Sequence, residues 1–150
     1  MVERSQTPSG DDKWPLLFAA WLIAFAASLA VLFIGEVLGQ TPCNLCWFQR
    51  GFMFPLAIIL SVAVWRSDTG VWIYGLPLAI GGALIAAFHT LLYAGIIPDA
   101  IQPCTAKGPS CSSADMTIFG APLPLLALIA FAVIAATLIA AKGAAKRKSP

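Results

Sequence analysis

Residues 15–38 read PLLFAAWLIAFAASLAVLFIGEVL, and Glu36 is the single charged residue among them. At about 1.5 Å per residue, a helix over this stretch is longer than the roughly 30 Å hydrocarbon core of a bilayer. Its apolar side chains fall on every helical face rather than on one stripe, which is typical of a helix surrounded by lipid. The run is also too long for the core of a secretory signal peptide. We therefore expect a retained first membrane helix.

Three further apolar stretches follow, at 47–64, 71–92 and 122–141. Together the four stretches hold 84 of the 150 residues but only two of the 16 charged side chains, Glu36 and Arg50. Because lipid offers the backbone no hydrogen bonds, each stretch must be helical. The sequence therefore predicts an all-α protein, an integral membrane four-helix bundle that forms a single domain.

The overall composition excludes several other classes of protein. Hydrophobic residues make up 59% of the chain and charged residues only 11%, whereas an ordinary soluble domain carries about a quarter charged residues. A soluble domain and a disordered tail are therefore excluded. The formal net charge of +2 gives no reason to expect nucleic acid as a partner, so membrane lipid is the expected surrounding.

The basic residues predict how the bundle is oriented. Lysine and arginine collect in the cytoplasmic connections of membrane proteins. Seven of the nine fall on one side of the predicted bundle, so we expect both termini to be cytoplasmic. The seven are Arg4, Lys13, Arg66, Lys142, Lys146, Arg147 and Lys148, and the other two are Lys107 and the boundary residue Arg50.

The four cysteines fall in two pairs, and both pairs lie in loops on the face away from the cytoplasm. The pairs are Cys43 and Cys46 in the loop at about 39–46, and Cys104 and Cys111 in the loop at about 93–121. Two structural disulfides in a non-enzymatic membrane subunit are one interpretation, but such short loops would contribute only about 2 to 2.5 kcal/mol each. A four-thiolate zinc site is another, although the six-residue spacing of the second pair is longer than usual. We favour redox chemistry, because short local pairs are typical of disulfides that open and close.

The residues around the first pair support redox chemistry. Cys43 and Cys46 follow Pro42 and are expected to open the second helix. The partial positive charge at the N-terminus of a helix stabilises a thiolate. Arg50 lies one turn below Cys46 on the same helix face, and an arginine within a membrane helix is a functional candidate. His89 is expected at the same depth on the third helix, which suggests a pocket that it shares with Arg50. Glu36 is left without an assigned role.

The electrons of such a dithiol need an acceptor. The sequence contains no dinucleotide-binding, haem-attachment or metal-ligand motif, so a lipid-soluble quinone is the expected cofactor. We expect it to meet Cys46 from within the bilayer, with Arg50 and either His89 or Gln49 donating hydrogen bonds to its carbonyl oxygens. Ubiquinone and menaquinone fit these residues equally well.

Two motifs and the second cysteine pair resemble the DsbB family of quinone-linked disulfide bond formation proteins. The motifs are TPCNLCWFQR at 41–50 and HTLL at 89–92, and the compact second pair is similar to the shorter BdbC branch. The resemblance implies a bacterial inner-membrane protein with its cysteine loops on the periplasmic side. It also implies that Cys104 and Cys111 exchange with a DsbA-like thioredoxin-fold oxidase and pass electrons to Cys43 and Cys46. Whether that partner is general or dedicated, and the oligomeric state, stay open.

Overall fold

The computed structural model describes residues 13–98 and 117–146, with side chains described as far as Lys142. Four helical segments within these ranges are long and apolar enough to cross a membrane, which confirms the predicted all-α membrane bundle. The second cysteine pair, Cys104 and Cys111, lies outside the described residues, as do both ends of the chain. The helices are α1 (Trp14–Leu32), α2 (Asn44–Arg66), α3 (Trp72–Tyr93) and α4 (Leu123–Lys146).

Short elements extend or connect these helices. A π-helical turn, η1 (Phe33–Val37), prolongs α1 and carries Glu36, which is exposed. A 3-10 turn, η2 (Thr69–Val71), leads into α3. The strands β1 (Thr117–Ile118) and β2 (Ala121–Pro122) form an antiparallel hairpin immediately before α4.

The second helix begins earlier than the sequence predicts. We expected a loop as far as residue 46, but α2 starts at Asn44 because Cys43 acts as its N-cap. The Cys43 backbone is extended, with φ −70° and ψ 169°, and its sulfur accepts a hydrogen bond from the backbone N–H of Cys46. This bond satisfies one of the amide groups that a helix N-terminus leaves free. Cys46 therefore lies within the first turn of the helix.

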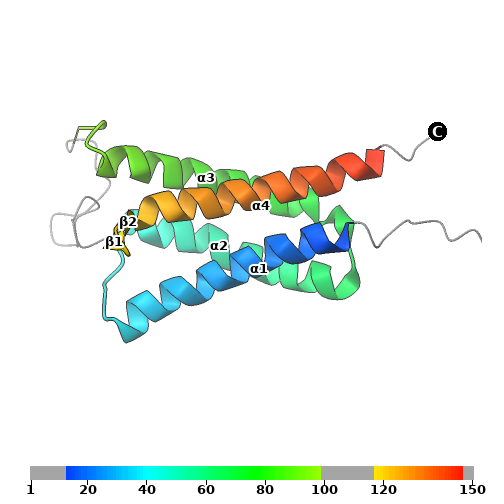
Figure 1. Ribbon diagram of the computed structural model, residues 1–150, viewed down its shortest axis with the longest axis horizontal. Coiled ribbons are helices and arrows are strands. Elements are labelled where there is room, and N and C mark those ends of the chain that lie inside the picture. Colours follow the sequence, from blue (N-terminus) through cyan, green and yellow to red (C-terminus); the bar gives the residue numbers. More distant parts are fainter. Residues whose placement is uncertain (1–12, 99–116, 147–150) are drawn as a thin grey trace, which may run out of the picture.

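The expected loop at 93–121 also contains regular structure in its described part. Phe119 and Gly120 join the two strands of the hairpin and both have positive φ, 52° and 81°. Two successive residues with positive φ are typical of the tight turns that join antiparallel strands. The hairpin places α4 directly after a sharp reversal of the chain, at the same end of the bundle as the start of α2 (Figure 1).

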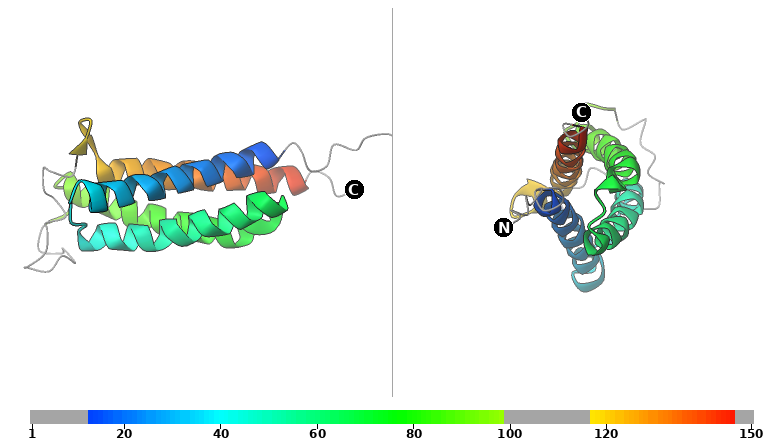
Figure 2. Two further views of the ribbon diagram at one scale, coloured as in Figure 1. Left: turned by 90° about the horizontal axis from the view of Figure 1, so that it is seen from below. Right: turned by 90° about the vertical axis from the view of Figure 1, so that its right-hand side faces the viewer.

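The four helices form a closed ring in which α1 packs against α2 and α4, and α3 packs against the same two helices. The end-on view in Figure 2 shows this arrangement. Glycines allow close approach between α3 and α4: Gly82 lies against the ring of Phe131, and Gly75 lies against Leu138. Close packing through small residues is the main source of helix association in lipid, where burial of apolar surface contributes little.

The two ends of the bundle differ in what they carry. The start of α1, the end of α4 and the connection between α2 and α3 lie at one end (Figure 1). At this end the Lys142 ammonium lies 4.2 Å from the centre of the Trp72 ring, as expected of groups that anchor a helix at a membrane interface. The start of α2, which carries the first cysteine pair, and the hairpin lie at the opposite end (Figure 1). Apolar side chains point outward between the ends, and Ile58 and Leu84 are about two thirds exposed.

Candidate active site

Cys43 and Cys46 form a close pair of free thiols at the start of α2. Their sulfur atoms lie 2.9 Å apart, and the Cys46 backbone N–H lies 3.3 Å from the Cys43 sulfur. Cys43 is buried, with 1% of its surface exposed, whereas Cys46 is half-buried. The cap geometry thus holds both sulfurs within reach of one disulfide and leaves Cys46 the more accessible of the two.

The surroundings of Cys43 favour its thiolate form. The hydrogen bond with the Cys46 thiol is the largest effect and lowers the pKa of Cys43. Burial acts in the opposite direction, while the contact with His89 and the backbone N–H of Cys46 lower the pKa of Cys43 further. Hydrogen bonds that stabilise the charged form outweigh desolvation here, so the pKa of Cys43 lies well below the ordinary range of a cysteine.

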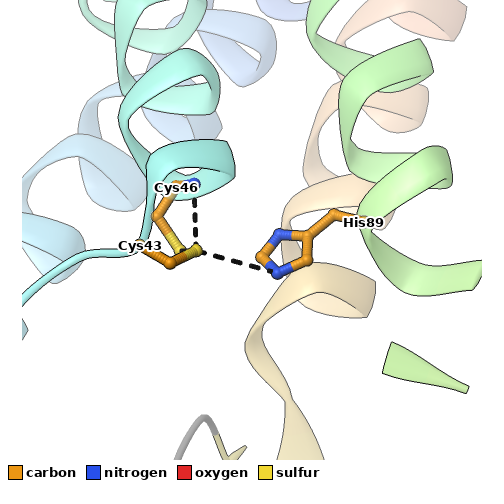
Figure 3. Close-up of side chains that lie close together, drawn as sticks. All are labelled: Cys43, Cys46 and His89. Atoms are coloured by element: carbon orange, nitrogen blue, oxygen red, sulfur yellow. Dashed lines mark hydrogen bonds between the residues drawn. The ribbon is translucent and has the colours of Figure 1, made fainter. Parts of the chain in front are cut away.

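His89, the only histidine in the chain, reaches this pair from α3. Its side chain is fully buried, and its Nε2 atom lies 3.9 Å from the sulfur of Cys43. Figure 3 shows the ring pointing from α3 toward the two sulfurs on α2. On the other side of the ring, Nδ1 lies 3.1 Å from the side-chain nitrogen of Gln49. Gln49 therefore fixes the orientation of the imidazole against Cys43.

Arg50 points away from His89 and toward α1. Its Nη2 donates a hydrogen bond to the backbone oxygen of Val31 at 2.9 Å, and Cζ lies 5.6 Å from the centre of the Trp47 ring. Gly35 leaves room for the guanidinium, since a Cβ there would lie 3.2 Å from Nη2. Among the described residues Arg50 has no carboxylate partner. Its positive charge is therefore available to a ligand.

A cavity of about 300 Å³ lies between α1, α2 and α4 and includes both cysteines in its wall. The polar side chains of the wall are Arg50, Gln49, Gln40 and Thr41, and most of the remaining wall is apolar. The apolar part comes largely from Ala27, Ala30, Val31 and Ile34 near the end of α1, Met53 of α2, and Leu123, Leu126, Ala127, Ala130 and Phe131 of α4. The arrangement presents a dithiol and one cation to an apolar ligand.

The structure brings most of the expected site residues together. Cys43, Cys46, Gln49 and Arg50 line the cavity. His89 is not among the lining residues, but it contacts two of them, Cys43 and Gln49, whereas Arg50 bonds to Val31 of α1. Because α2 lies between α1 and α3 in the ring, side chains that leave α2 on opposite faces meet different helices.

Sequence reasoning missed the cavity walls from α1 and α4 and the role of Gly35. Gly35 accommodates Arg50, whereas Gly39, four residues later, has φ +67° and a Cβ there would meet no atom within 4 Å. A signal in the sequence could have found this contact. Gly35 lies about one turn before the end of the first apolar stretch, and Arg50 lies at the matching depth near the start of the second apolar stretch.

A metal ion has one possible set of ligands within the part of the chain that the structure describes. The ligand atoms of Cys43, Cys46 and His89 all lie within 4.8 Å of one another. This set combines the two thiols of one cysteine pair with an imidazole, rather than the four thiolates that the sequence suggested as an alternative.

Comparison with known proteins assigns the chain to a family. The profile of the family described as "Disulfide bond formation protein DsbB" matches residues 13–141. A "Probable disulfide formation protein" of Metapseudomonas resinovorans is 62% identical over 133 residues, which cover 88% of this chain and 92% of the relative. "Disulfide bond formation protein C" of Bacillus subtilis is 41% identical over 128 residues, covering 85% and 92% respectively. No solved structure matches. The chain therefore belongs to the DsbB family and is a membrane protein of disulfide bond formation.

Proposed function

We propose that the protein is a membrane thiol:quinone oxidoreductase that reoxidises a DsbA-type thioredoxin-fold protein. In this proposal electrons enter at Cys104 and Cys111, pass to Cys43 and Cys46, and leave to ubiquinone or menaquinone. One observation carries the proposal: both sulfurs of the first pair and the Arg50 side chain line the same, mostly apolar cavity. Membership of the DsbB family supports the oxidoreductase activity.

The cavity fits the head group of a quinone in size and chemistry. Its volume of about 300 Å³ is at the lower end of the range for small-molecule sites, which is about 300–1,000 Å³. A quinone ring is flat and apolar apart from its carbonyl oxygens, so it needs apolar walls and a few hydrogen-bond donors. When bound, it supplies an acceptor for two electrons and two protons.

The residues of the chain supply the rest of the reaction. One bond forms between the sulfurs of Cys43 and Cys46, and the dithiol loses two electrons and two protons. Cys46 is the sulfur that faces the acceptor, since it is the more exposed of the pair. Nε2 of His89, 3.9 Å from the Cys43 sulfur, is placed to hold the proton that leaves Cys43. Arg50 orients the acceptor and stabilises negative charge that develops on it.

The family and the charges support the proposed partner and the proposed side of the membrane. The DsbB family name implies a DsbA-like partner in general. The excess of basic residues expected on the cytoplasmic side supports a periplasmic position for the cysteines. The start of α2, which carries Cys43 and Cys46, lies at the end of the bundle opposite the start of α1 and the end of α4 (Figure 1), which supports this orientation.

Purified protein tests the proposal when it is mixed with the reduced partner and a soluble quinone. We expect quinone reduction that follows the oxidation of the partner, and we expect Cys46→Ser to abolish it. Ser28→Ala is the matched control, because the Ser28 hydroxyl bonds within α1 to the Ala24 oxygen and is not among the residues that line the cavity. Full activity of Cys46→Ser, or no quinone reduction by the unaltered protein, would overturn the proposal.

Thiol trapping separates this function from a membrane subunit braced by two structural disulfides. A brace stays oxidised whether or not quinone is supplied. A relay shifts toward free thiols when quinone is withheld and the reduced partner is present. We expect the shift at all four cysteines, and cysteines that stay oxidised under both conditions would support the brace.

A further inference from the structure

We propose that the reduced form of the first cysteine pair, together with His89, is a binding site for a thiophilic divalent cation such as Zn²⁺. The two sulfurs and a ring nitrogen of His89 come from two different helices, yet they all lie within 4.8 Å of one another. Figure 3 shows the three side chains converging on one point between α2 and α3. The site requires only the reduced cysteines, so it does not depend on the proposed quinone chemistry.

The distances are close to those of a zinc shell. Zinc binds cysteine sulfur at about 2.3 Å and histidine nitrogen at about 2.0–2.1 Å in tetrahedral geometry, which places ligand atoms roughly 3.5–3.8 Å apart. Here the two sulfurs are 2.9 Å apart, and Nε2 of His89 is 3.9 Å from the sulfur of Cys43. Side-chain rotations that move the two sulfurs apart and keep both near the imidazole would bring the three ligand atoms to tetrahedral spacing.

Gln49 prepares the imidazole for this role. Metal-binding histidines generally hydrogen-bond through the ring nitrogen that does not bind the metal, and this second bond fixes the ring orientation. Gln49 makes such a contact at Nδ1 of His89, at 3.1 Å, so Nε2 is turned toward the sulfurs. The side-chain nitrogen of Gln49 faces Nδ1 here, and a half-turn of the Gln49 amide would bring its oxygen into position to accept a hydrogen bond from Nδ1–H, the tautomer in which Nε2 can bind a metal.

Ligand chemistry and access select the kind of ion. Thiolate and imidazole ligands favour Zn²⁺ over Mg²⁺ and Ca²⁺, which prefer oxygen. Both cysteines line the cavity and Cys46 is only half-buried, so an ion has a path to the site. Three protein ligands leave a fourth tetrahedral position for water. Binding releases whatever protons the two sulfurs still hold and transfers no electrons.

A bound cation would also stop the reaction of the dithiol. It holds both sulfurs in metal bonds, so the bond between the two sulfurs cannot form while the cation is present. This consequence rests on the proposed function, and it makes the cation a reversible inhibitor that captures the reduced state. A chelator should restore activity, because the cysteines are not oxidised in the process.

Cobalt titration of the reduced protein tests the site without quinone or partner. We would use the Cys104→Ser, Cys111→Ser background without a polyhistidine tag, reduced and kept free of oxygen. We expect one equivalent of Co²⁺ to produce thiolate-to-cobalt charge transfer and the visible bands of tetrahedral cobalt, and Zn²⁺ to displace it. X-ray absorption of the zinc form should show one imidazole, and with a single histidine in the chain that signal assigns His89.

Substitutions complete the test. We expect His89→Ala to weaken cobalt binding by at least about 10- to 100-fold, the loss typical even of outer-shell changes. Thr90→Val is the matched control, because the Thr90 hydroxyl bonds to the Ala86 oxygen within α3. No cobalt binding by the parent, unweakened binding by His89→Ala, or a zinc spectrum without imidazole would each overturn the proposal. The zinc spectrum needs no substitution at His89, so poor folding of that variant cannot obscure the result.

Discussion

Replacing Arg50 by methionine tests the proposed quinone site most specifically. Methionine keeps an unbranched side chain but removes the only positively charged group among the described residues that line the cavity. Nη2 of Arg50 already donates to the Val31 oxygen at 2.9 Å, so the other nitrogens of the guanidinium are the donors that remain for a ligand. The substitution therefore removes one charged hydrogen bond to the acceptor and leaves the cysteines in place.

The size of the effect follows from that one bond. A hydrogen bond from a charged donor contributes about 1.5–3 kcal/mol, and each 1.4 kcal/mol changes a binding constant about tenfold. We therefore expect Arg50→Met to raise the KM for quinone by about 10- to 100-fold. Arg50→Lys should recover part of this loss, because lysine keeps the charge but not the planar fork of donors.

Steady-state rates of quinone reduction, measured at saturating reduced partner, provide the assay. Arg66→Met is the matched control, because Arg66 is exposed at the opposite end of the same helix. Thermal unfolding of each variant in detergent identifies any loss of folding caused by the missing bond to Val31. A KM for quinone that stays unchanged in folded Arg50→Met would refute the proposed role of Arg50.

Three further predictions test the packing, the thiolate and the cavity. Gly82→Ala should lower the Tm in detergent, since its Cβ would overlap the Phe131 ring and overpacking costs about 1–3 kcal/mol. Gly51→Ala is the control and should not lower the Tm, because a Cβ at Gly51 would meet nothing within 4 Å. Equal Tm values for the two variants would contradict the packing. Because the Cys46 thiol lowers the pKa of Cys43, the thiolate absorbance of the reduced pair should persist at neutral pH. The stabilisation that this gives the folded state is complete above the ordinary cysteine pKa, declines as the pH falls below it, and is gone once the pH has fallen through the lowered pKa. Thiolate absorbance that disappears near the ordinary cysteine pKa would contradict the lowered pKa. Ala130→Leu should raise the KM for quinone by filling the cavity without changing the thiolate absorbance, and an unaltered KM would place the quinone elsewhere.

The membrane bundle could be predicted because it depends on the length and composition of local stretches. Four apolar runs of sufficient length leave the chain few alternatives in lipid. The start of α2 was harder, since the sequence does not show that the Cys43 sulfur itself caps the helix. The π-helical turn at Phe33–Val37 was likewise not predicted, although such turns are frequent at functional sites.

The site could be predicted in its residues but not in its arrangement. The spacing of Cys43, Cys46 and Arg50 along one helix is local, so sequence alone places them near one another. Contacts between helices depend on how each helix is rotated in the bundle. Arg50 meets a carbonyl 19 residues away and His89 meets a sulfur 46 residues away. No pattern along the chain separates these two directions.

A single-turnover experiment tests the central claim, the direct transfer of electrons from the first cysteine pair to quinone. The Cys104→Ser, Cys111→Ser variant would be reduced, freed of reductant and mixed with one equivalent of quinone in the absence of oxygen. Quinol and free thiols are then counted in the same sample. We predict that two thiols are lost, at Cys43 and Cys46, for each quinol that forms. Thiols that remain free while the quinone stays oxidised would contradict the account.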